Sequence, residues 1–394
     1  MGNHIICLST IDWNFVKQRH QILMELFAKN KNKVIFVEHL GFERQKIKNI
    51  PNIIKKIAKA ISQRLKTTTQ AQENITIITS IALPPTNRIF NLLNELVFLK
   101  FLTTKLAKLY DKKPIIWTYT ATSTALNIIK KLKPELVIYD CVCDTLRHPE
   151  APFDIETTEK ELLKSADLVF TDARYFYELK KKYNPHTYQI PPGVDFEHFN
   201  VTAVSDKNVL SIMDRIKRPR ICSFTGIDRN RIRVDLDLID FIADKKPEWS
   251  IIMIGPMHIK IPKQLSCRKN VIWLGTKSYA ELPHYLNQCD VLILPYKLNE
   301  YTQSIFPAKT FECLATGKPV VSTALPELNI FKDLIAIANN PSDFIKGIEN
   351  ALLNDTSIDR DKRITFAREN PWDKRFKTVY EKIESALCEK ERKK

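Results

Sequence analysis

Short apolar runs of four to six residues recur along the chain, and longer amphipathic stretches separate them. Apolar runs of this length are typical of strands buried on both faces of a parallel sheet, and the stretches between them are long enough for helices. The runs lie at residues 5–9, 34–38, 75–79, 115–118, 136–140 and 168–171, then at 220–225, 250–254, 271–274, 290–295 and 319–323. This pattern predicts an α/β protein with two open parallel sheets.

The runs pause at Pro191-Pro192-Gly193 and in the polar stretch that follows. A chain of 394 residues is long for one such domain and suits two. We therefore expect an N-terminal Rossmann-like domain over 1–200, a C-terminal one over 201–368, and a helix over 369–394 whose apolar stripe packs back on the first domain. Ligands of open α/β sheets bind beyond the carboxyl ends of strands, so the site is expected in a cleft between two facing sheets.

The eight cysteines are scattered, and the close pair Cys141 and Cys143 has no second pair at zinc-like spacing. This usage predicts a reducing compartment and no metal site. Residues 1–9 do not resemble a signal peptide, and no window approaches the ~18 uninterrupted apolar residues of a spanning helix. We expect a cytoplasmic protein that is not integral to a membrane.

The net charge of +16 is compatible with nucleic acid, anionic lipid or a phosphate-bearing small molecule as partner, or with a lysine-rich composition alone. Residues 50–66 place isoleucines on one helical face and lysines on the rest, as in an interfacial helix. Residues 89–109 are rich in Leu and Phe. Packing on the first sheet would also explain both segments, but together they favour an anionic membrane surface at the inner face. Basic residues interleaved with exposed aromatics are not evident, so nucleic acid is not expected.

The richest motif is residues 290–323, DVLILPYKLNEYTQSIFPAKTFECLATGKPVVST. A buried strand ends at a polar loop, a Pro-x-Lys-x-x-Glu element opens a helix, and Gly-Lys-Pro leads into the next strand. This order resembles the nucleotide-sugar-binding segment of GT-B glycosyltransferases of retaining family 4, also described as glycosyl transferases group 1, of the teichuronic-acid and exopolysaccharide type. A helix N-terminus after a strand offers free N–H groups to a diphosphate.

The resemblance implies roles for residues within this motif. Glu312 would hold the ribose hydroxyls of a UDP- or GDP-sugar, and Lys309, one helical turn earlier, would contact a phosphate or the sugar. Thr302 and Ser304 would lie at the donor. Ser304 stands where the family has a second glutamate, and Glu300 could replace it only if the loop is remodelled. No cofactor is expected, because the nucleotide sugar is a substrate.

Further matches follow the same order along the chain. Residues 225–239, TGIDRNRIRVDLDLI, resemble the loop that supplies a basic residue to the donor phosphates, which makes Gly226 and either Arg231 or Arg233 donor-site candidates. Gly275 lies in a stretch that resembles the loop beside the nucleobase of the donor in this family. No GxGxxG or Walker-A pattern is present in the sequence, so the diphosphate must be held by side chains and the helix of the second domain.

The first domain shows the same resemblance. Residues 9–21, STIDWNFVKQRHQ, resemble the loop after the first strand, where Asp12, Trp13 and Arg19 would face the acceptor. The stretch YDCVCD places Asp144 just beyond a predicted strand. We predict Asp144 first and Asp12 second as catalytic carboxylates, although a carboxylate at a strand end is often only a cap or turn residue.

These observations predict a metal-independent, retaining hexosyltransferase that moves a sugar from a nucleotide-sugar donor to a membrane-associated saccharide or lipid-linked acceptor in surface polysaccharide biosynthesis. Retention by front-side attack would require no base, whereas inversion would require one of the carboxylates. The alternatives are a nucleotide-sugar-binding GT-B scaffold without activity, for which Ser304 is the supporting feature, and a GT-B epimerase that needs no acceptor.

Overall fold

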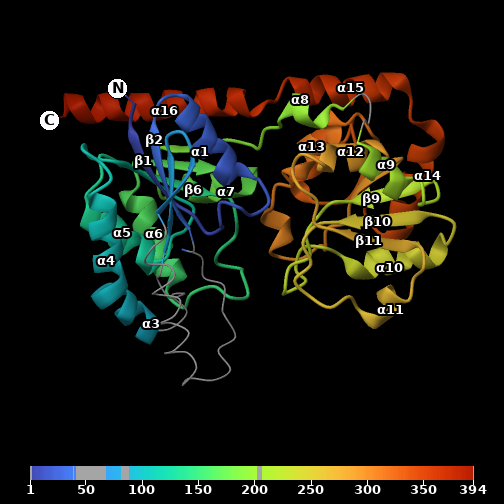
Figure 1. The fold of residues 1–394 in the computed structure, drawn as a ribbon, viewed down its shortest axis with the longest axis horizontal. Helices are drawn as coiled ribbons and strands as arrows, with labels where there is room; N and C mark the ends of the chain where they lie inside the picture. The colour runs from blue at the N-terminus through green and yellow to red at the C-terminus, as the bar shows by residue number, and fades with distance from the viewer. Residues whose placement is uncertain (1, 39, 41–67, 81–87, 202–205, 394) are drawn as a thin grey trace. The chain divides into compact units, whose positions relative to one another are not determined.

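The computed structural model describes residues 2–38, 40, 68–80, 88–201 and 206–393 (Figure 1). The chain divides into two compact units, each treated separately below. The first comprises Met1–Pro191 and Phe376–Lys394, and the second comprises Pro192–Arg375. The boundaries predicted from the sequence lie near residues 200 and 368, within about ten residues of these boundaries. The basic segment 50–66 lies outside the described residues.

The first unit is built on an eight-stranded sheet of order β3-β4-β2-β1-β5-β6-β7-β8. All neighbouring strands are parallel except β3 and β4, and Ile5 pairs with Val34 on one side and Ile115 on the other. The strands are β1 (His4–Leu8), β2 (Lys33–Glu38), β3 (Thr68–Gln72), β4 (Ile75–Thr79), β5 (Ile115–Thr118), β6 (Leu136–Cys141), β7 (Leu168–Thr171) and β8 (Thr187–Gln189).

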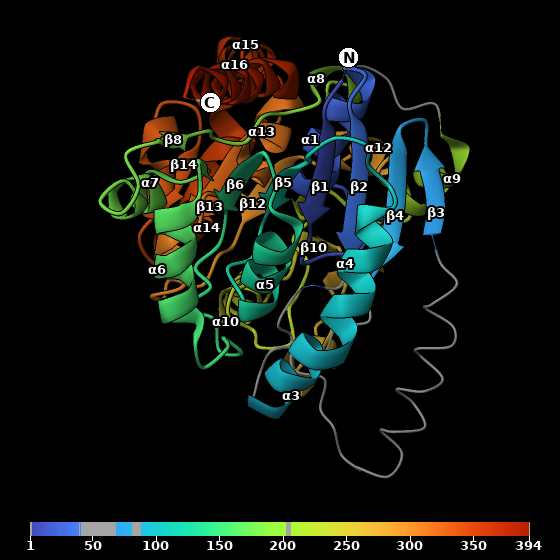
Figure 2. The same cartoon turned by 90° about the vertical axis from the view of Figure 1, so that its left-hand side faces the viewer.

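Helices cover this sheet on both faces, and α4, α5 and α6 lie on the same side of it (Figure 2). Thr122 caps α5 by accepting a hydrogen bond from the Ala125 amide, and the left-handed Lys133 ends it. The helices of this unit are α1 (Arg19–Lys29), α3 (Arg88–Leu93), the π-helix η1 (Asn94–Phe98), α4 (Leu99–Ala107), α5 (Ser123–Leu132), α6 (Ile155–Ser165) and α7 (Arg174–Lys180).

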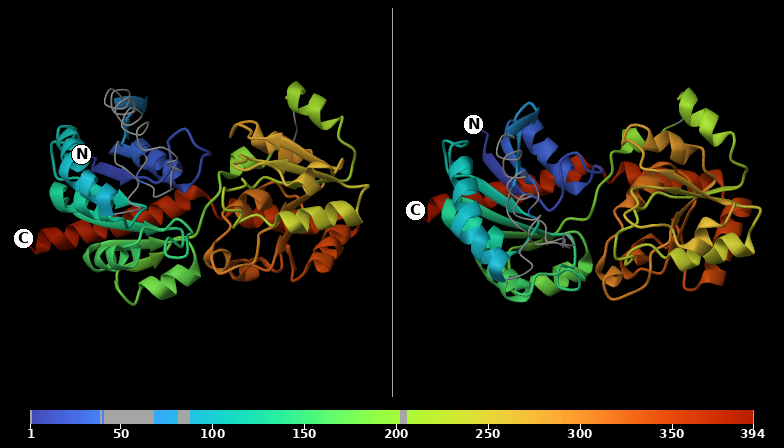
Figure 3. Two further views of the ribbon diagram at one scale, coloured as in Figure 1. Left: turned by 90° about the horizontal axis from the view of Figure 1, so that it is seen from below. Right: turned by 60° about the horizontal axis from the view of Figure 1, so that its bottom comes forward.

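The C-terminal helix α16 (Trp372–Arg392) runs along the first unit in both views of Figure 3. Its apolar stripe contacts α1, where the ring of Phe376 lies 4.8 Å from that of Phe27 in an edge-to-face arrangement. Near its end, Lys390 pairs with Asp167 at 2.7 Å. The first part of α16 therefore packs against α1, and its C-terminal end reaches the residue before β7.

The second unit holds a six-stranded parallel sheet of order β11-β10-β9-β12-β13-β14. Its strands are β9 (Arg220–Ser223), β10 (Ser250–Ile254), β11 (Val271–Gly275), β12 (Val291–Leu294), β13 (Val320–Thr323) and β14 (Ala336–Ala338). Its helices are α8 (Phe196–Phe199), α9 (Lys207–Met213), α10 (Leu236–Lys245), α11 (Lys263–Ser266), α12 (Leu282–Asn287), η2 (Thr302–Ser304), α13 (Lys309–Ala315), η3 (Pro326–Phe331), α14 (Pro341–Asn354) and α15 (Ser357–Arg368).

The predicted α/β class with two mostly parallel sheets is confirmed, and each predicted strand is present within about two residues. Three strands without a clear sequence signal are β3, β8 and β14, and each lies at the edge of its sheet. An edge strand has one bonded neighbour and is less completely covered, so it does not need a continuous apolar run. The sequence TTQAQ of β3 is mostly exposed, as this reasoning implies.

None of the helices in the described ranges is long and apolar enough to span a bilayer. Residues 89–109 form α3, η1 and α4, and one face of this segment packs inward through Leu99, Leu102 and Leu106. The other face leaves Leu96 64% exposed and Phe101 45% exposed. Ordinary packing therefore accounts for only part of the apolar content of this segment.

Candidate functional site

In the second unit, the segments after β9 and β12 bring polar side chains together at the carboxyl edge of the sheet. Val234 bridges to Tyr296 in an antiparallel pair, and the Lys297 amide donates to the Arg233 carbonyl at 2.8 Å. Tyr296 is buried, and this burial raises the pKa of its hydroxyl to about 12, with Arg233 acting in the opposite direction. Its phenol therefore stays neutral and lies in the field of Arg233 and Glu312.

Helix α13 carries the two residues of the Pro-x-Lys-x-x-Glu element. Glu312 is half-buried, and burial raises the pKa of its carboxyl, while the charge of Lys309 lowers it. The Lys309 ammonium lies 5.8 Å from the centroid of the Phe224 ring, in the loop after β9. A partly desolvated carboxylate next to a cation can accept hydrogen bonds from a diol while the cation faces a phosphate.

The two arginines of the loop after β9 differ in their surroundings. Arg233 donates from Nη2 to the Tyr301 hydroxyl at 3.2 Å, and its guanidinium lies 5.9 Å from the centroid of that ring. Arg231 is exposed and adopts a left-handed backbone with φ of 53°. The Asp228 carboxylate accepts hydrogen bonds from the loop amides and fixes its path. Arg233 is thus the arginine that contacts the segment leading into α13.

The loop between β12 and α13 is held by its own side chains. Asn299 donates from Nδ2 to the Ile232 carbonyl at 2.8 Å and accepts from the amides of Tyr301 and Thr302. The Ser304 hydroxyl donates to the Tyr301 carbonyl at 2.8 Å, and the Thr302 hydroxyl donates to the Lys297 carbonyl. Both hydroxyls are buried and stabilise the loop. Their contact with a donor stays a prediction.

Two glycines predicted at the donor site occupy different environments. Gly226 is tightly packed, because an added Cβ would come within 3.0 Å of the Pro256 side chain. Gly275 has a φ of 68°, and an added Cβ would meet no atom within 4 Å. The backbone at Gly275 is therefore open on its side-chain face, and its left-handed conformation favours glycine.

Sequence reasoning assigned no role to Tyr296, Tyr301 or Asn299, although all three lie in the 290–323 motif. Their position just after a buried strand could have marked them as candidates, because ligands of open α/β sheets bind beyond the carboxyl ends of strands. Their contacts with the Arg233 loop depend on the pairing of Val234 with Tyr296.

In the first unit, the predicted acceptor-side residues fall into two groups. Asp144 is buried and accepts from the Arg147 guanidinium at 3.0 Å and from the Arg147 amide at 3.1 Å, as a turn-capping residue does. Asp12 is exposed, and Trp13 packs edge-to-face on Phe36 at 5.0 Å. The catalytic roles of Asp144 and Asp12 stay predictions.

Arg19 does not lie on the surface beside Asp12 and Trp13, but inside the unit at the N-terminus of α1. Its Nε donates to Asp140 Oδ2 at 2.9 Å and its Nη1 donates to the Ile190 carbonyl at 2.9 Å. Asp172, directly after β7, lies within electrostatic range of both charged groups. Arg19 therefore forms a buried ion pair at the carboxyl edge of the sheet, and its contact with an acceptor stays a prediction.

The groups around this ion pair have strongly shifted pKa values. Burial raises the pKa of the Asp172 carboxyl to about 8, with Arg19 opposing the shift and Asp140 adding to it. His20 stacks on Tyr119 with ring centroids 3.6 Å apart, and burial next to Arg19 lowers its pKa to about 3. The sequence suggested His20 as a weaker acceptor-side candidate and gave no role to Asp140, Asp172 or Tyr119, although these three lie at the ends of strands.

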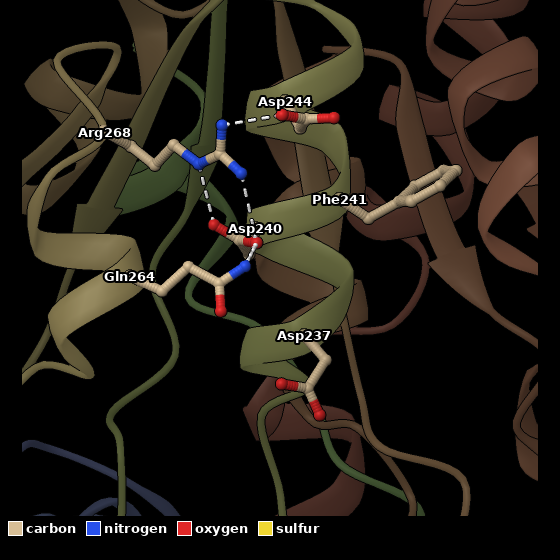
Figure 4. Close-up of a pocket in the computed structure, with 6 residues that line it drawn as sticks. All are labelled: Asp237, Asp240, Phe241, Asp244, Gln264 and Arg268. Atoms are coloured by element: carbon tan, nitrogen blue, oxygen red, sulfur yellow. Dashed lines mark hydrogen bonds and ion pairs between the residues drawn. The ribbon is translucent and has the colours of Figure 1, made fainter.

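A separate pocket lies on the outer face of α10 and α11 (Figure 4). Arg268 pairs with Asp240 and with Asp244, each at 2.8 Å, and Gln264 donates to Asp240. These carboxylates are already neutralised by Arg268. Among the described residues, no group of three or more His, Cys, Asp or Glu side chains could hold a metal ion.

Two Rossmann-like units, with polar residues at the carboxyl edge of each sheet, define the GT-B class of fold. Solved structures of this class align with nearly the whole chain. HepE of Anabaena, solved with UDP and glucose, matches with a TM-score of 0.70 at 14% identity, over 98% of this chain and 100% of HepE. Sucrose-phosphate synthase of Thermosynechococcus elongatus matches with a TM-score of 0.71 at 14% identity, over 98% and 99% of the two chains.

Sequence comparison finds a family match within the second unit. Residues 218–354 match the family described as glycosyl transferases group 1. A protein of Bacillus subtilis (strain 168), TuaH, which is named as a candidate teichuronic acid biosynthesis glycosyltransferase, is 29% identical over 238 residues. That alignment covers 57% of this chain and 58% of TuaH, so it spans little more than half of either protein. The resemblance stated from the sequence is confirmed.

Proposed function

We propose that this protein is a glycosyltransferase that moves a sugar from a nucleotide-sugar donor to a saccharide or lipid-linked acceptor in surface polysaccharide biosynthesis. The observation that carries the proposal is the cluster of Lys309, Glu312, Arg233 and Tyr296 at the carboxyl edge of the second sheet. This cluster lies within the part of the chain that matches glycosyl transferases group 1.

The charges of the cluster suit a nucleoside diphosphate. Lys309 and Arg233 supply positive charge to the leaving diphosphate, which would make transfer independent of a metal ion. Glu312 would accept hydrogen bonds from the ribose hydroxyls. The structural neighbour HepE was solved with UDP and with UDP-glucose, which supports a UDP-sugar before a GDP-sugar. A retaining, front-side transfer is the proposed stereochemical course.

We further propose that the acceptor is presented at the inner face of a membrane. Leu92, Leu93, Leu96 and Phe101 leave apolar side chains exposed on α3, η1 and α4, and Lys100 lies among them. Exposed apolar residues with nearby lysines are typical of segments that bind an anionic lipid surface. The overall charge of +16 acts in the same direction.

The donor site is tested by thermal stabilisation with a panel of UDP-, GDP- and dTDP-sugars. A ligand that binds only the folded state raises both the free energy of unfolding and Tm. At a ligand concentration a hundredfold above Kd, the free energy of unfolding rises by about 2.7 kcal/mol. We expect one nucleotide class to stabilise the wild type, and Glu312→Ala to lose that response. Glu248→Ala, an exposed glutamate before β10, should respond as the wild type does.

Two outcomes would contradict the proposal in different ways. Stabilisation by no nucleotide sugar would exclude a donor site. Stabilisation without transfer to any acceptor in a membrane extract would instead support a nucleotide-sugar-binding scaffold. Equal thermal stabilisation of the wild type and Glu312→Ala would show that Glu312 does not contact the ribose. The glycosyltransferase assignment itself would then still stand.

The membrane proposal has a separate test, which is co-sedimentation with vesicles of anionic or zwitterionic lipid. The variant Leu96→Gln/Phe101→Gln should bind anionic vesicles at least about a hundredfold less tightly, because each of the two buried apolar side chains contributes about 1.5–3 kcal/mol. Leu353→Gln, which changes an 81% exposed leucine of the second unit, is the matched control. Unchanged binding of the double variant would exclude this segment as the lipid contact.

A further inference from the structure

The carboxyl edge of the first sheet contains buried polar atoms without hydrogen-bond partners. Within the described ranges these atoms are Arg19 Nη2, Asp140 Oδ1, Thr171 Oγ1, Asp172 Oδ1 and the Tyr119 hydroxyl. Buried polar groups in folded proteins are nearly always paired, so a concentration of unpaired ones at one place needs a specific explanation. This edge is also where ligands of open α/β sheets bind.

The charges at this edge are unbalanced. One guanidinium, that of Arg19, faces two carboxyl groups, those of Asp140 and Asp172. Asp140 receives the direct hydrogen bond from Arg19 Nε at 2.9 Å, while Asp172 shows no such bond and its Oδ1 is unpaired. The Asp172 carboxyl accepts hydrogen bonds from backbone amides but has no direct counter-ion. A buried carboxylate without a counter-ion is costly, so Asp140 is the ionised partner of Arg19 and Asp172 retains its proton.

We propose that Asp172 is an acceptor-side residue that acts as a neutral carboxylic acid and donates a hydrogen bond to an oxygen of the saccharide acceptor. This inference rests on the proposed glycosyltransferase function. Asp172 directly follows β7, at the edge where ligands of open α/β sheets bind, and its Oδ1 is buried there without a hydrogen-bond partner. A neutral carboxyl group orients an acceptor without removing its proton, which is compatible with transfer that needs no base.

The other titratable groups of this cluster do not change charge near neutral pH. From α1, Arg19 stays cationic because its pKa is raised, and His20 stays neutral because its pKa is about 3. Tyr119 after β5 and Cys7 of β1 have pKa values raised well above the ordinary ones by burial. Asp140 of β6 is the remaining member; burial raises the pKa of its carboxyl, and the ion pair with Arg19 opposes this shift. Between about pH 6.5 and 9, Asp172 is the group of this cluster that titrates.

The test compares Asp172→Asn, which keeps a neutral group with a donor, with Asp172→Ala, which removes both. The measured quantity is the rate of sugar transfer to the saccharide acceptor in a membrane extract, with the nucleotide sugar that the stabilisation panel identifies as donor, from about pH 6.5 to 9.5. The wild-type rate should fall above about pH 8. Asp172→Asn should retain most of the rate without this fall, and Asp172→Ala should be about tenfold slower at each pH, because one hydrogen bond is lost.

Asp167→Asn is the matched control, because Asp167 directly precedes β7 at the opposite edge of the sheet. Its carboxylate accepts from the Val137 amide at 2.8 Å and pairs with Lys390, so it serves the fold. This variant should keep the alkaline fall of the wild type. The same fall in Asp172→Asn, or a wild-type rate in Asp172→Ala, would overturn the proposal.

A second measurement is independent of any substrate. The Tm of the wild type should decrease from about pH 6.5 to 8, because the folded chain retains the Asp172 proton that the unfolded chain has already released, and Asp172→Asn should lack this decrease. A wild type without this decrease would overturn the inference alone. Failure of all nucleotide sugars to bind would instead overturn the proposed function.

Discussion

The first unit contains two buried charge clusters that differ in how fully their polar atoms are hydrogen-bonded. In the first, Lys180 Nζ lies 2.7 Å from Glu159 Oε2, and the Tyr139 hydroxyl donates to Glu159 Oε1 at 2.8 Å, so both carboxylate oxygens are satisfied. In the second, Arg19 faces Asp140 and Asp172 and leaves polar atoms of all three unpaired. A network in which every polar atom is paired stabilises the fold, whereas a network with unpaired polar atoms can still form hydrogen bonds with a ligand.

The largest expected effect follows from breaking the complete cluster. Lys180→Met leaves Glu159 buried beside Tyr139 without a counter-ion, which should lower the free energy of unfolding by about 3–5 kcal/mol. Urea denaturation measures this loss. The double variant Lys180→Met/Glu159→Gln should recover most of it, because no unpaired charge remains. A loss below about 1 kcal/mol in the single variant would show that the pair is not desolvated.

A smaller effect is expected in the incomplete cluster. In Asp140→Asn, Arg19 loses its direct partner, but Asp172 is close enough to ionise and replace it. The loss of unfolding free energy should therefore be limited to about 2 kcal/mol. The pKa of Asp172 should also fall, so the decrease of stability between about pH 6.5 and 8 should weaken. A loss as large as that of Lys180→Met would contradict the idea that two carboxyl groups share one arginine.

The smallest effect concerns the acid side of the pH dependence. The folded pKa of His20 is about 3, below its ordinary value of 6.5, so the unfolded chain binds more protons between these values and stability falls as pH decreases below 6.5. His20→Phe keeps a ring on Tyr119 and removes this dependence. Relative to pH 8, the variant at pH 5.5 should lose about 1.4 kcal/mol less than the wild type.

Asp172 changes the free energy of unfolding with pH in the opposite direction to His20. The pH ranges of the two effects overlap. The folded pKa of Asp172, about 8, lies above the ordinary 3.8, so its contribution to stability is lost as pH rises between these values. Below pH 6.5 the His20 and Asp172 slopes oppose each other. His20→Phe should therefore expose the Asp172 slope down to about pH 4. A variant with the same acid loss as the wild type would mean that His20 is protonated in the folded state.

The strands of both sheets were predictable because a strand covered on both faces must be apolar throughout, as Ile251 to Ile254 of β10 illustrates. Edge strands such as β3 and β14 escaped prediction because this requirement is relaxed there. The proximity of Lys309 and Glu312, the proposed donor-site pair, was also predictable, since a spacing of three residues on one helix brings them onto the same face.

The sequence by itself determined the α/β class, the two sheets and the polar residues that follow their strands, because these depend on periodicity and on neighbours along the chain. Only the tertiary structure decided that Arg19 bonds Asp140 across 121 residues, with Asp172 beside them. This contact depends on the order of strands in the sheet, in which β6 and β7 are adjacent. The protonation of Asp172 follows from burial and from its neighbours, and both are properties of the folded chain.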